Sequence, residues 1–211
     1  NSHELGASLA GARSTDGGFT FEKFDNNPLK RASGGSDAIY HNGKYYVYYS
    51  NTADSGIPSI YLKILDDPQE FMSADSILVL TTGGGPDNFD LESVAAGRIF
   101  QLNDRWYVVY PGSDRHFDFP HRFHAAWSDD LINWTKIDNE FPLMTRGPWG
   151  EWDQGALWYG EVFEHLDTLY MFYEGWGCYC IPGNRDQPYF PGHSRTGIAR
   201  VPVEDFLLWA D

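Results

Sequence analysis

Four acidic residues lie at or near the start of strand-like segments, where their carboxylates can face a shared space. General acid–base chemistry needs one group that donates a proton and a second that accepts one, and two carboxyl groups can divide these roles. Hydrolysis of a glycosidic bond uses such a pair. A histidine near the C-terminal end is a further candidate acid. The predicted catalytic residues are Asp37, Asp90, Asp153, Glu161 and His193.

Asp90 and Asp153 occupy matching positions of an internal repeat. Each follows an aromatic residue and lies seven residues before a glycine that opens a strand-like segment. An aspartate repeated in every unit fits two interpretations: it is structural scaffolding, or it faces an axis that the units share. Of the two, Asp153 is the preferred catalytic candidate.

Asp37 and Glu161 match each other in a second register. Each lies nine residues before a tyrosine, Tyr46 or Tyr170, and Arg98 takes the same place in the unit between them. A non-catalytic role is the alternative for both acids. Asp37 follows Gly-Gly-Ser, where an aspartate often caps a turn, and Glu161 could be a solvated or ion-paired carboxylate.

Two segments carry side chains suited to binding a sugar. Residues 115–124 contain three histidines, His116, His121 and His124, together with Arg122. Alternation along a strand puts His121 and His124 on opposite faces. Binding of sugar hydroxyl or carboxylate groups is therefore favoured over a metal site in this segment. Residues 176–194, rich in Gly, Pro and aromatics, predict a long loop that forms a wall or lid. The predicted substrate-binding residues are Glu92, Arg122, His124, Trp149, Trp152, Trp158 and Trp176, although some of these tryptophans must belong to the core.

The elements that position these residues can be read from the repeat. Residues 89–112 match residues 152–175 without a gap at an offset of 63, and each copy reads as a strand, a tight polar turn and a second strand. A third copy turns at Asn42-Gly43, a strong hairpin signal. Further hairpins turn at Ser-Asp motifs near residues 14 and 128, which are structural. Four strands in each period of about sixty residues are typical of propeller blades.

The sequence therefore predicts an all-β fold, a β-propeller of four-stranded blades forming a single domain over residues 1–211. We expect a partial blade at 1–31, whole blades at 32–92 and 93–150, and a partial blade at 151–211. Closed propellers have four to eight blades, so we expect more sequence, or another chain or copy, to complete the ring. An open array is disfavoured because its edges would be exposed.

Three segments carry a resemblance to a known superfamily. Ala125–Trp134 resembles the strand and turn of the five-bladed propeller glycosidases, and Trp152–Leu157 with Tyr170–Gly175 is similar to the opening of their blades. These are glycoside hydrolase families 43, 32 and 117. The resemblance implies an axial pocket with acids from the innermost strands, and a plant or algal oligo- or polysaccharide as substrate. The histidine acid of family 117 supports His193, whereas the usual Asn-Asp-Pro motif of the first blade is missing.

Composition excludes several function classes. The net charge of −15 repels nucleic acid and anionic membranes, and no run of ~20 apolar residues or signal peptide is visible. The expected partner is carbohydrate and the expected location is secreted or periplasmic. We expect no cofactor, with an axial calcium ion left open. The alternative functions are a non-catalytic carbohydrate-binding propeller or a structural propeller assembled with partner chains.

Overall fold

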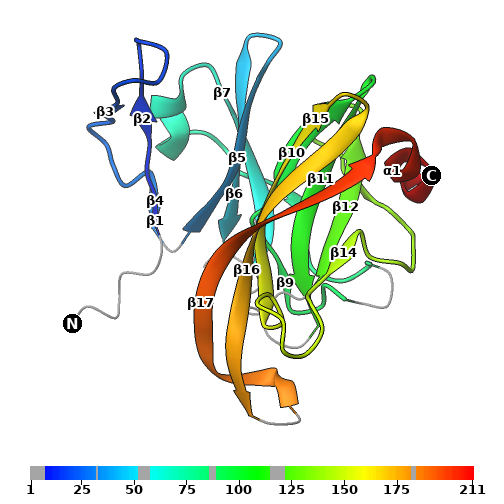
Figure 1. The fold of residues 1–211 in the computed structure, drawn as a ribbon. Helices are drawn as coiled ribbons and strands as arrows, with labels where there is room; N and C mark the ends of the chain where they lie inside the picture. The colour runs from blue at the N-terminus through cyan, green and yellow to red at the C-terminus, as the bar shows by residue number, and fades with distance from the viewer. Residues whose placement is uncertain (1–7, 32, 52–57, 86–88, 115–121, 182–183) are drawn as a thin grey trace.

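The chain folds almost entirely into antiparallel β-structure. A computed structural model describes residues 8–31, 33–51, 58–85, 89–114, 122–181 and 184–211, with an N-terminal element on one side and a helix at the C-terminus (Figure 1). Its elements are β1 (Ser8–Leu9), β2 (Ala12–Arg13), β3 (Glu22–Lys23), β4 (Lys30–Arg31), β5 (Ser33–His41), β6 (Lys44–Asn51), β7 (Ser59–Leu65), the 3-10 helix η1 (Pro68–Met72), β8 (Ile77–Leu80), β9 (Ser93–Val94), β10 (Arg98–Leu102), β11 (Arg105–Ser113), β12 (Arg122–Ser128), β13 (Thr135–Lys136), β14 (Met144–Thr145), β15 (Ala156–His165), β16 (Thr168–Ile181), β17 (Asn184–Pro202) and α1 (Val203–Ala210).

Three sheets form the body of the molecule. The first has the strand order β5-β6-β7-β8, and the second has the order β10-β11-β12-β13, with β9 paired to β11 and β14 paired to β12. The third has the order β15-β16-β17. In each sheet the chain runs outward from the first strand by antiparallel neighbours, as a propeller blade requires. The expected β-propeller architecture is confirmed for the described residues.

The predicted hairpins are present, and their turns explain their sequences. Asn42 and Gly43 both have positive φ (49° and 78°), the conformation that suits a two-residue hairpin turn and that Asn and Gly adopt most readily. Leu166 and Asp167 adopt the same conformation (50° and 56°) between β15 and β16. The repeat is therefore a repeat of hairpins, with turns at matching places.

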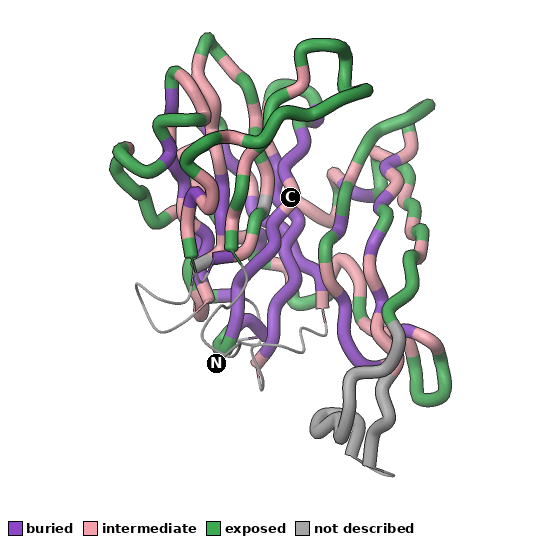
Figure 2. Tube along the Cα trace, turned by 90° about the vertical axis from the view of Figure 1, so that its left-hand side faces the viewer, coloured by how far each residue is buried: buried purple, intermediate pink, exposed green. Residues whose placement is uncertain are grey.

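Hydrophobic cores lie between successive sheets, and the buried stretches follow the strands (Figure 2). Leu62 and Val108 belong to the core between the first and second sheets. Val109 and Leu157 belong to the core between the second and third. Since each sheet buries a face against its neighbour, no sheet in the described chain is stable by itself.

The N-terminal element packs against part of the free face of the first sheet. Two small sheets, β1-β4 and β2-β3, place Leu9 and Leu29 against Tyr49 and Phe71. The polar turn at Ser14 and Asp16 is held by side-chain hydrogen bonds, as is its counterpart at Ser128, which matches the structural role expected from sequence. None of the helices in the described residues is long and apolar enough to cross a membrane.

One sequence expectation about the C-terminal part is wrong, and one element there was missed. Residues 176–194 do not form an irregular loop: apart from residues 182 and 183, their backbone continues β16 and β17 as a long antiparallel arm with several register shifts. The helix α1 was not anticipated. It follows β17 directly and buries Phe206 against Tyr107, with ring centroids 5.2 Å apart.

Candidate functional site

Asp37, Arg98 and Glu161 occupy equivalent positions on the first strands of three successive sheets. Each lies two residues before a cross-strand pair of the same kind: Ile39 with Tyr46, Phe100 with Tyr107, and Phe163 with Tyr170. The strands β5, β10 and β15 that carry them are neighbours in space. The second register predicted from sequence therefore corresponds to one continuous line of charged side chains.

Asp37 joins the first sheet to the second. Its Oδ2 accepts a hydrogen bond from the backbone N–H of Ile99 (2.7 Å), and its Oδ1 accepts one from the N–H of Ala38 (2.7 Å). The irregular pairing of β5 between Gly35 and Ala38 turns this carboxylate out of the ladder. Asp37 also lines a cavity of about 480 Å³ that extends to the N-terminal strands and Phe24.

Arg98 joins the second sheet to the third. Its Nε lies 3.2 Å from Oε2 of Glu161, and its guanidinium lies 5.6 Å from the ring centroid of Tyr159. The Arg98 side chain is 20% exposed and that of Glu161 is 64% exposed. Nη1 of Arg98 is buried and makes no hydrogen bond to any residue that the structure describes. Arg98 is thus a mostly buried cation that holds an exposed carboxylate.

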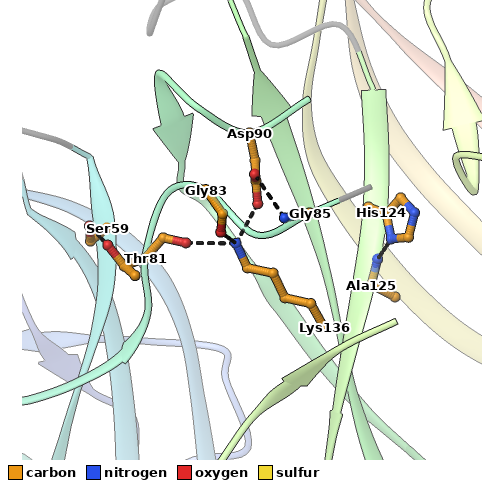
Figure 3. Close-up of polar contacts among 8 residues, drawn as sticks. All are labelled: Ser59, Thr81, Gly83, Gly85, Asp90, His124, Ala125 and Lys136. Carbon is orange, nitrogen blue, oxygen red and sulfur yellow. Dashed lines mark hydrogen bonds and ion pairs between the residues drawn. The ribbon is translucent and has the colours of Figure 1, made fainter. Parts of the chain in front are cut away.

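Asp90 lies elsewhere and is fully buried, within the group of polar contacts drawn in Figure 3. Its carboxylate pairs with Nζ of Lys136, which also donates hydrogen bonds to the carbonyl oxygens of Thr81 and Gly83 (both 2.7 Å). The backbone N–H of Gly85 donates to Oδ1 of Asp90 (3.3 Å). Lys136 therefore ties β13 to the segment that leaves β8, across two sheets.

Burial shifts the titration of the groups around Asp90. Desolvation, followed by the Asp90 carboxylate, raises the pKa of Tyr110 well above its usual value. Desolvation lowers the pKa of Lys136 despite the pairing with Asp90. Asp90 itself is inaccessible to solvent and the Lys136 side chain is only 14% exposed, so this ion pair connects the two sheets in the interior.

Asp153 repeats part of this arrangement in the third sheet. The hydroxyl of Tyr173 donates a hydrogen bond to its Oδ2 (3.0 Å), and Trp152 stacks on the Tyr173 ring at 5.7 Å. Asp153 is 8% exposed. Gly175 faces this pair so closely that a Cβ there would lie 2.5 Å from the Trp152 ring. The matching glycine, residue 112, faces Phe89 in the same way, at 2.4 Å.

The predicted acids are therefore divided between two settings. Asp90 and Asp153 are buried; Asp90 pairs with Lys136, and Asp153 accepts a hydrogen bond from Tyr173. Asp37 and Glu161 lie on β5 and β15, the first strands of the first and third sheets, and β10 lies between these two strands. Sequence reasoning placed Arg98 in line with them without assigning it a role, and it missed Lys136, which follows an ordinary Trp-Thr strand start.

The predicted binding residues also differ in setting. His124 is 1% exposed; the N–H of Ala125 donates to its Nδ1 (3.0 Å), so Nε2 carries the proton and donates to the carbonyl oxygen of Asn139 (3.0 Å). Burial lowers the pKa of His124. Both ring nitrogens are thus engaged with backbone. Arg122 is half-buried on β12, and Glu92 is exposed.

The four tryptophans divide in the same manner. Trp149 is 52% exposed, whereas Trp152 is packed on Tyr173. Trp158 lies 5.8 Å from Tyr159, close to Arg98, and Trp176 lies opposite Ala156 in the third sheet. His193 lies in β17 with its side chain outside the described part, and His116 and His121 lie outside the described residues. These binding roles stay predictions.

Among the residues that the structure describes, no three His, Cys, Asp or Glu side chains gather to form a metal site. The question of an axial calcium ion, left open by the sequence, gains no set of ligands from the described residues.

Comparisons with known proteins place the fold. No family model matches the sequence, and no curated protein matches it significantly. An N-acetylgalactosamine deacetylase from F. plautii has a TM-score of 0.69 at 15% identity, over 94% of this chain and 58% of that one. A family 117 glycoside hydrolase from the marine bacterium Zobellia galactanivorans has a TM-score of 0.60 at 18% identity, over 94% and 59%. A thermostable family-43 glycoside hydrolase has a TM-score of 0.60 at 17% identity, over 92% and 62%.

This chain spans less than two thirds of each of these structures. The identities are low, and the similarity concerns the fold. Glycoside hydrolases of families 43, 62 and 117 recur among the similar structures. The chain has the fold of the five-bladed β-propeller glycoside hydrolases.

Proposed function

We propose that this chain is the larger part of a glycoside hydrolase and that Asp37 and Glu161 are its acid pair. The observation that carries the proposal is their equivalence: they lie on the first strands of two sheets, with Arg98 on the strand between them touching Glu161. The N–H of Ile99, next to Arg98, binds Asp37. Contacts between successive sheets thus link Asp37 to β10 and link Arg98 of β10 to Glu161.

The two carboxylates differ in a way that suits two roles. Asp37 is held by two backbone N–H donors and so has a fixed orientation, which fits the carboxylate that activates water or attacks the sugar carbon. Glu161 is exposed, so a bound substrate can reach it, and we assign it the remaining role, that of the acid that protonates the leaving oxygen. Tyr159 lies beside Arg98, and Trp158 lies 5.8 Å from Tyr159; these rings can supply a stacking surface for a sugar ring.

The substrate we propose is an oligo- or polysaccharide of plant or algal origin, degraded outside the cytoplasm. The resemblance to families 43 and 117 supports this class, and similar solved structures include α-L-arabinofuranosidases. No redox cofactor is needed, because hydrolysis requires only the two carboxyl groups and water.

The test is hydrolysis of a panel of aryl glycosides and oligosaccharides by the polypeptide translated from the natural open reading frame. We expect Glu161→Gln and Asp37→Asn each to lower kcat by about 10²–10⁴-fold. The matched control is Glu164→Gln on the same strand, whose carboxylate caps the turn at Asp167 and is expected to leave kcat unchanged. Full turnover by Glu161→Gln rejects the proposal.

A carbohydrate-binding protein without catalysis is the second candidate, and the exposed Trp149 favours it. It predicts saturable sugar binding by calorimetry that survives Glu161→Gln, with no product from any glycoside. Because a deacetylase shares the fold, acetate release from N-acetylated sugars is measured in the same assays. Acetate without glycosidic cleavage would contradict the hydrolase assignment.

A further inference from the structure

A cavity of about 480 Å³ lies between the N-terminal element and the first sheet. Residues 9–14 and Phe24 form one of its walls, and β5, β6 and η1 form the other. Most of its lining side chains are apolar, including those of Leu9, Val47 and Phe71. Pockets that bind small molecules measure about 300–1,000 Å³ and have such a lining with a few polar groups. The cavity therefore has the size and composition of a small-molecule site.

Specific contacts hold the N-terminal wall of this cavity in place. The backbone N–H of Phe24 donates a hydrogen bond to the carbonyl oxygen of Gly11 (3.0 Å). The chain lies so close to the Phe24 ring that a Cβ at Gly11 would be 2.4 Å from it. Arg13 pairs with Asp67 beside η1, at 2.9 Å, and so connects the two walls. Because the walls are fixed before a ligand arrives, binding has a lower ordering cost.

Several polar groups on the lining already have partners within the protein. The Ser14 hydroxyl donates a hydrogen bond to Asp16 (2.7 Å). The Tyr48 hydroxyl donates one to the carbonyl oxygen of Leu131, and Arg13 is paired as described above. A sugar ring enclosed here would bury several hydroxyl groups with few partners, which is unfavourable. An aromatic ring has no such requirement, so the lining favours an aromatic ligand over a sugar.

The charged residues on the lining indicate a neutral ligand with one hydrogen-bond donor. Asp37 is the acidic residue of the lining and Arg13 is the basic one, so their formal charges balance. Each carboxylate oxygen of Asp37 accepts one backbone hydrogen bond, from Ala38 or from Ile99. An ionised carboxylate has about four acceptor positions, so Asp37 can also accept a hydrogen bond from a ligand hydroxyl. A phenol combines an apolar ring with such a donor.

We propose that this cavity binds a neutral substituted phenol, with the ring against Phe24 and the phenol hydroxyl donating to Asp37. An apolar cavity of about 150 Å³ is large enough to bind benzene. At about 480 Å³, this cavity has room for a ring that carries a side chain of several carbon atoms. Asp37 is also one of the two proposed acids, but the inference rests on the cavity and requires no glycosidase activity.

The test is calorimetric titration of the polypeptide translated from the natural open reading frame with methyl 4-hydroxycinnamate, a neutral substituted phenol. We expect saturable binding at one site. Methyl 4-methoxycinnamate has the same ring and side chain but no hydroxyl donor, so it should bind at least about tenfold more weakly. Phe24→Ala removes the ring from the wall, and Ala10→Leu adds atoms to the lining. Each substitution should weaken binding of the phenol by at least about tenfold.

The matched control is Phe21→Ala, which removes a 66% exposed ring of the N-terminal element that does not line the cavity and should leave the affinity unchanged. Thermal unfolding shows whether each variant is folded; Ala10 is exposed, so Ala10→Leu provides the test if Phe24→Ala unfolds. Absence of saturable binding to the unsubstituted protein overturns the proposal, as does equal affinity for the methoxy compound. Unchanged affinity in folded Ala10→Leu also overturns it, because the ligand then binds elsewhere. The titration needs no turnover, so its outcome is independent of the proposed activity.

Discussion

Removal of the Lys136 ammonium should destabilise the fold far more than removal of an exposed lysine. In Lys136→Met the apolar stem is kept, but Asp90, which is fully buried, loses its counter-charge. The carbonyl oxygens of Thr81 and Gly83 also lose their donor. Breaking a buried pair by removing one partner costs about 3–5 kcal/mol. For a chain of this length that corresponds to a fall in Tm of roughly 6–20 °C.

The measurement is urea and thermal unfolding followed by circular dichroism, with Lys44→Met as the matched control. Lys44 pairs with Asp66 at 2.6 Å, but both side chains are exposed, so its loss should cost less than about 1 kcal/mol. The double variant Asp90→Asn with Lys136→Met carries no unpaired charge. It should recover part of the loss, with a coupling energy of about 0.5–3 kcal/mol. Equal Tm values for Lys136→Met and Lys44→Met would show that the buried Lys136–Asp90 pair does not stabilise the fold.

Three further predictions concern stability. Burial and the Asp153 contact raise the pKa of Tyr173 to about 12, so the contribution of Tyr173 to the free energy of unfolding should be complete below pH 10 and lost as the pH rises toward 12. In urea unfolding at alkaline pH, Tyr173→Phe should show a smaller loss of stability over this range. Burial lowers the pKa of His124 below 6.5, so the free energy of unfolding should fall as the pH drops below that value. The prediction is contradicted if the urea midpoint of His124→Phe changes with pH between 5 and 8 as steeply as that of the unsubstituted protein. Gly175→Ala forces a Cβ against Trp152 and should cost about 1–3 kcal/mol by thermal unfolding; an unchanged Tm would show that the ring moves freely.

The hairpins and their order were predictable because they depend on local signals. Alternating strands and turn residues with positive φ, such as Asn42 and Gly43, specify a hairpin regardless of its neighbours. The offset of 63 then identifies the sheets as repeats of one unit. The fold class follows from these two observations, and the comparisons confirm it.

The helix α1 and the β16–β17 arm were missed because their signals are weak or misleading. The helix has eight residues and begins after Pro202 without a side-chain cap. The arm contains glycines and prolines that predict a loop, and its backbone accommodates them by register shifts near Cys178 and Cys180. Tertiary pairing overrides local composition there.

The candidate site was only partly predictable. The repeat matched Asp90 to Asp153 and Asp37 to Glu161. A sequence repeat does not show which of these two pairs is buried. Burial depends on contacts between sheets, and the decisive one comes from Lys136, 46 residues from Asp90 along the chain. No local sequence pattern predicts such a contact.

The most direct test of the proposed site is a crystal structure of the Glu161→Gln variant, in its natural polypeptide, with an oligosaccharide bound. The proposal predicts a sugar ring between Asp37 and residue 161, with Trp158 or Tyr159 against its face and the two side chains roughly 5–10 Å apart. A sugar seated elsewhere, with position 161 facing solvent, would contradict it.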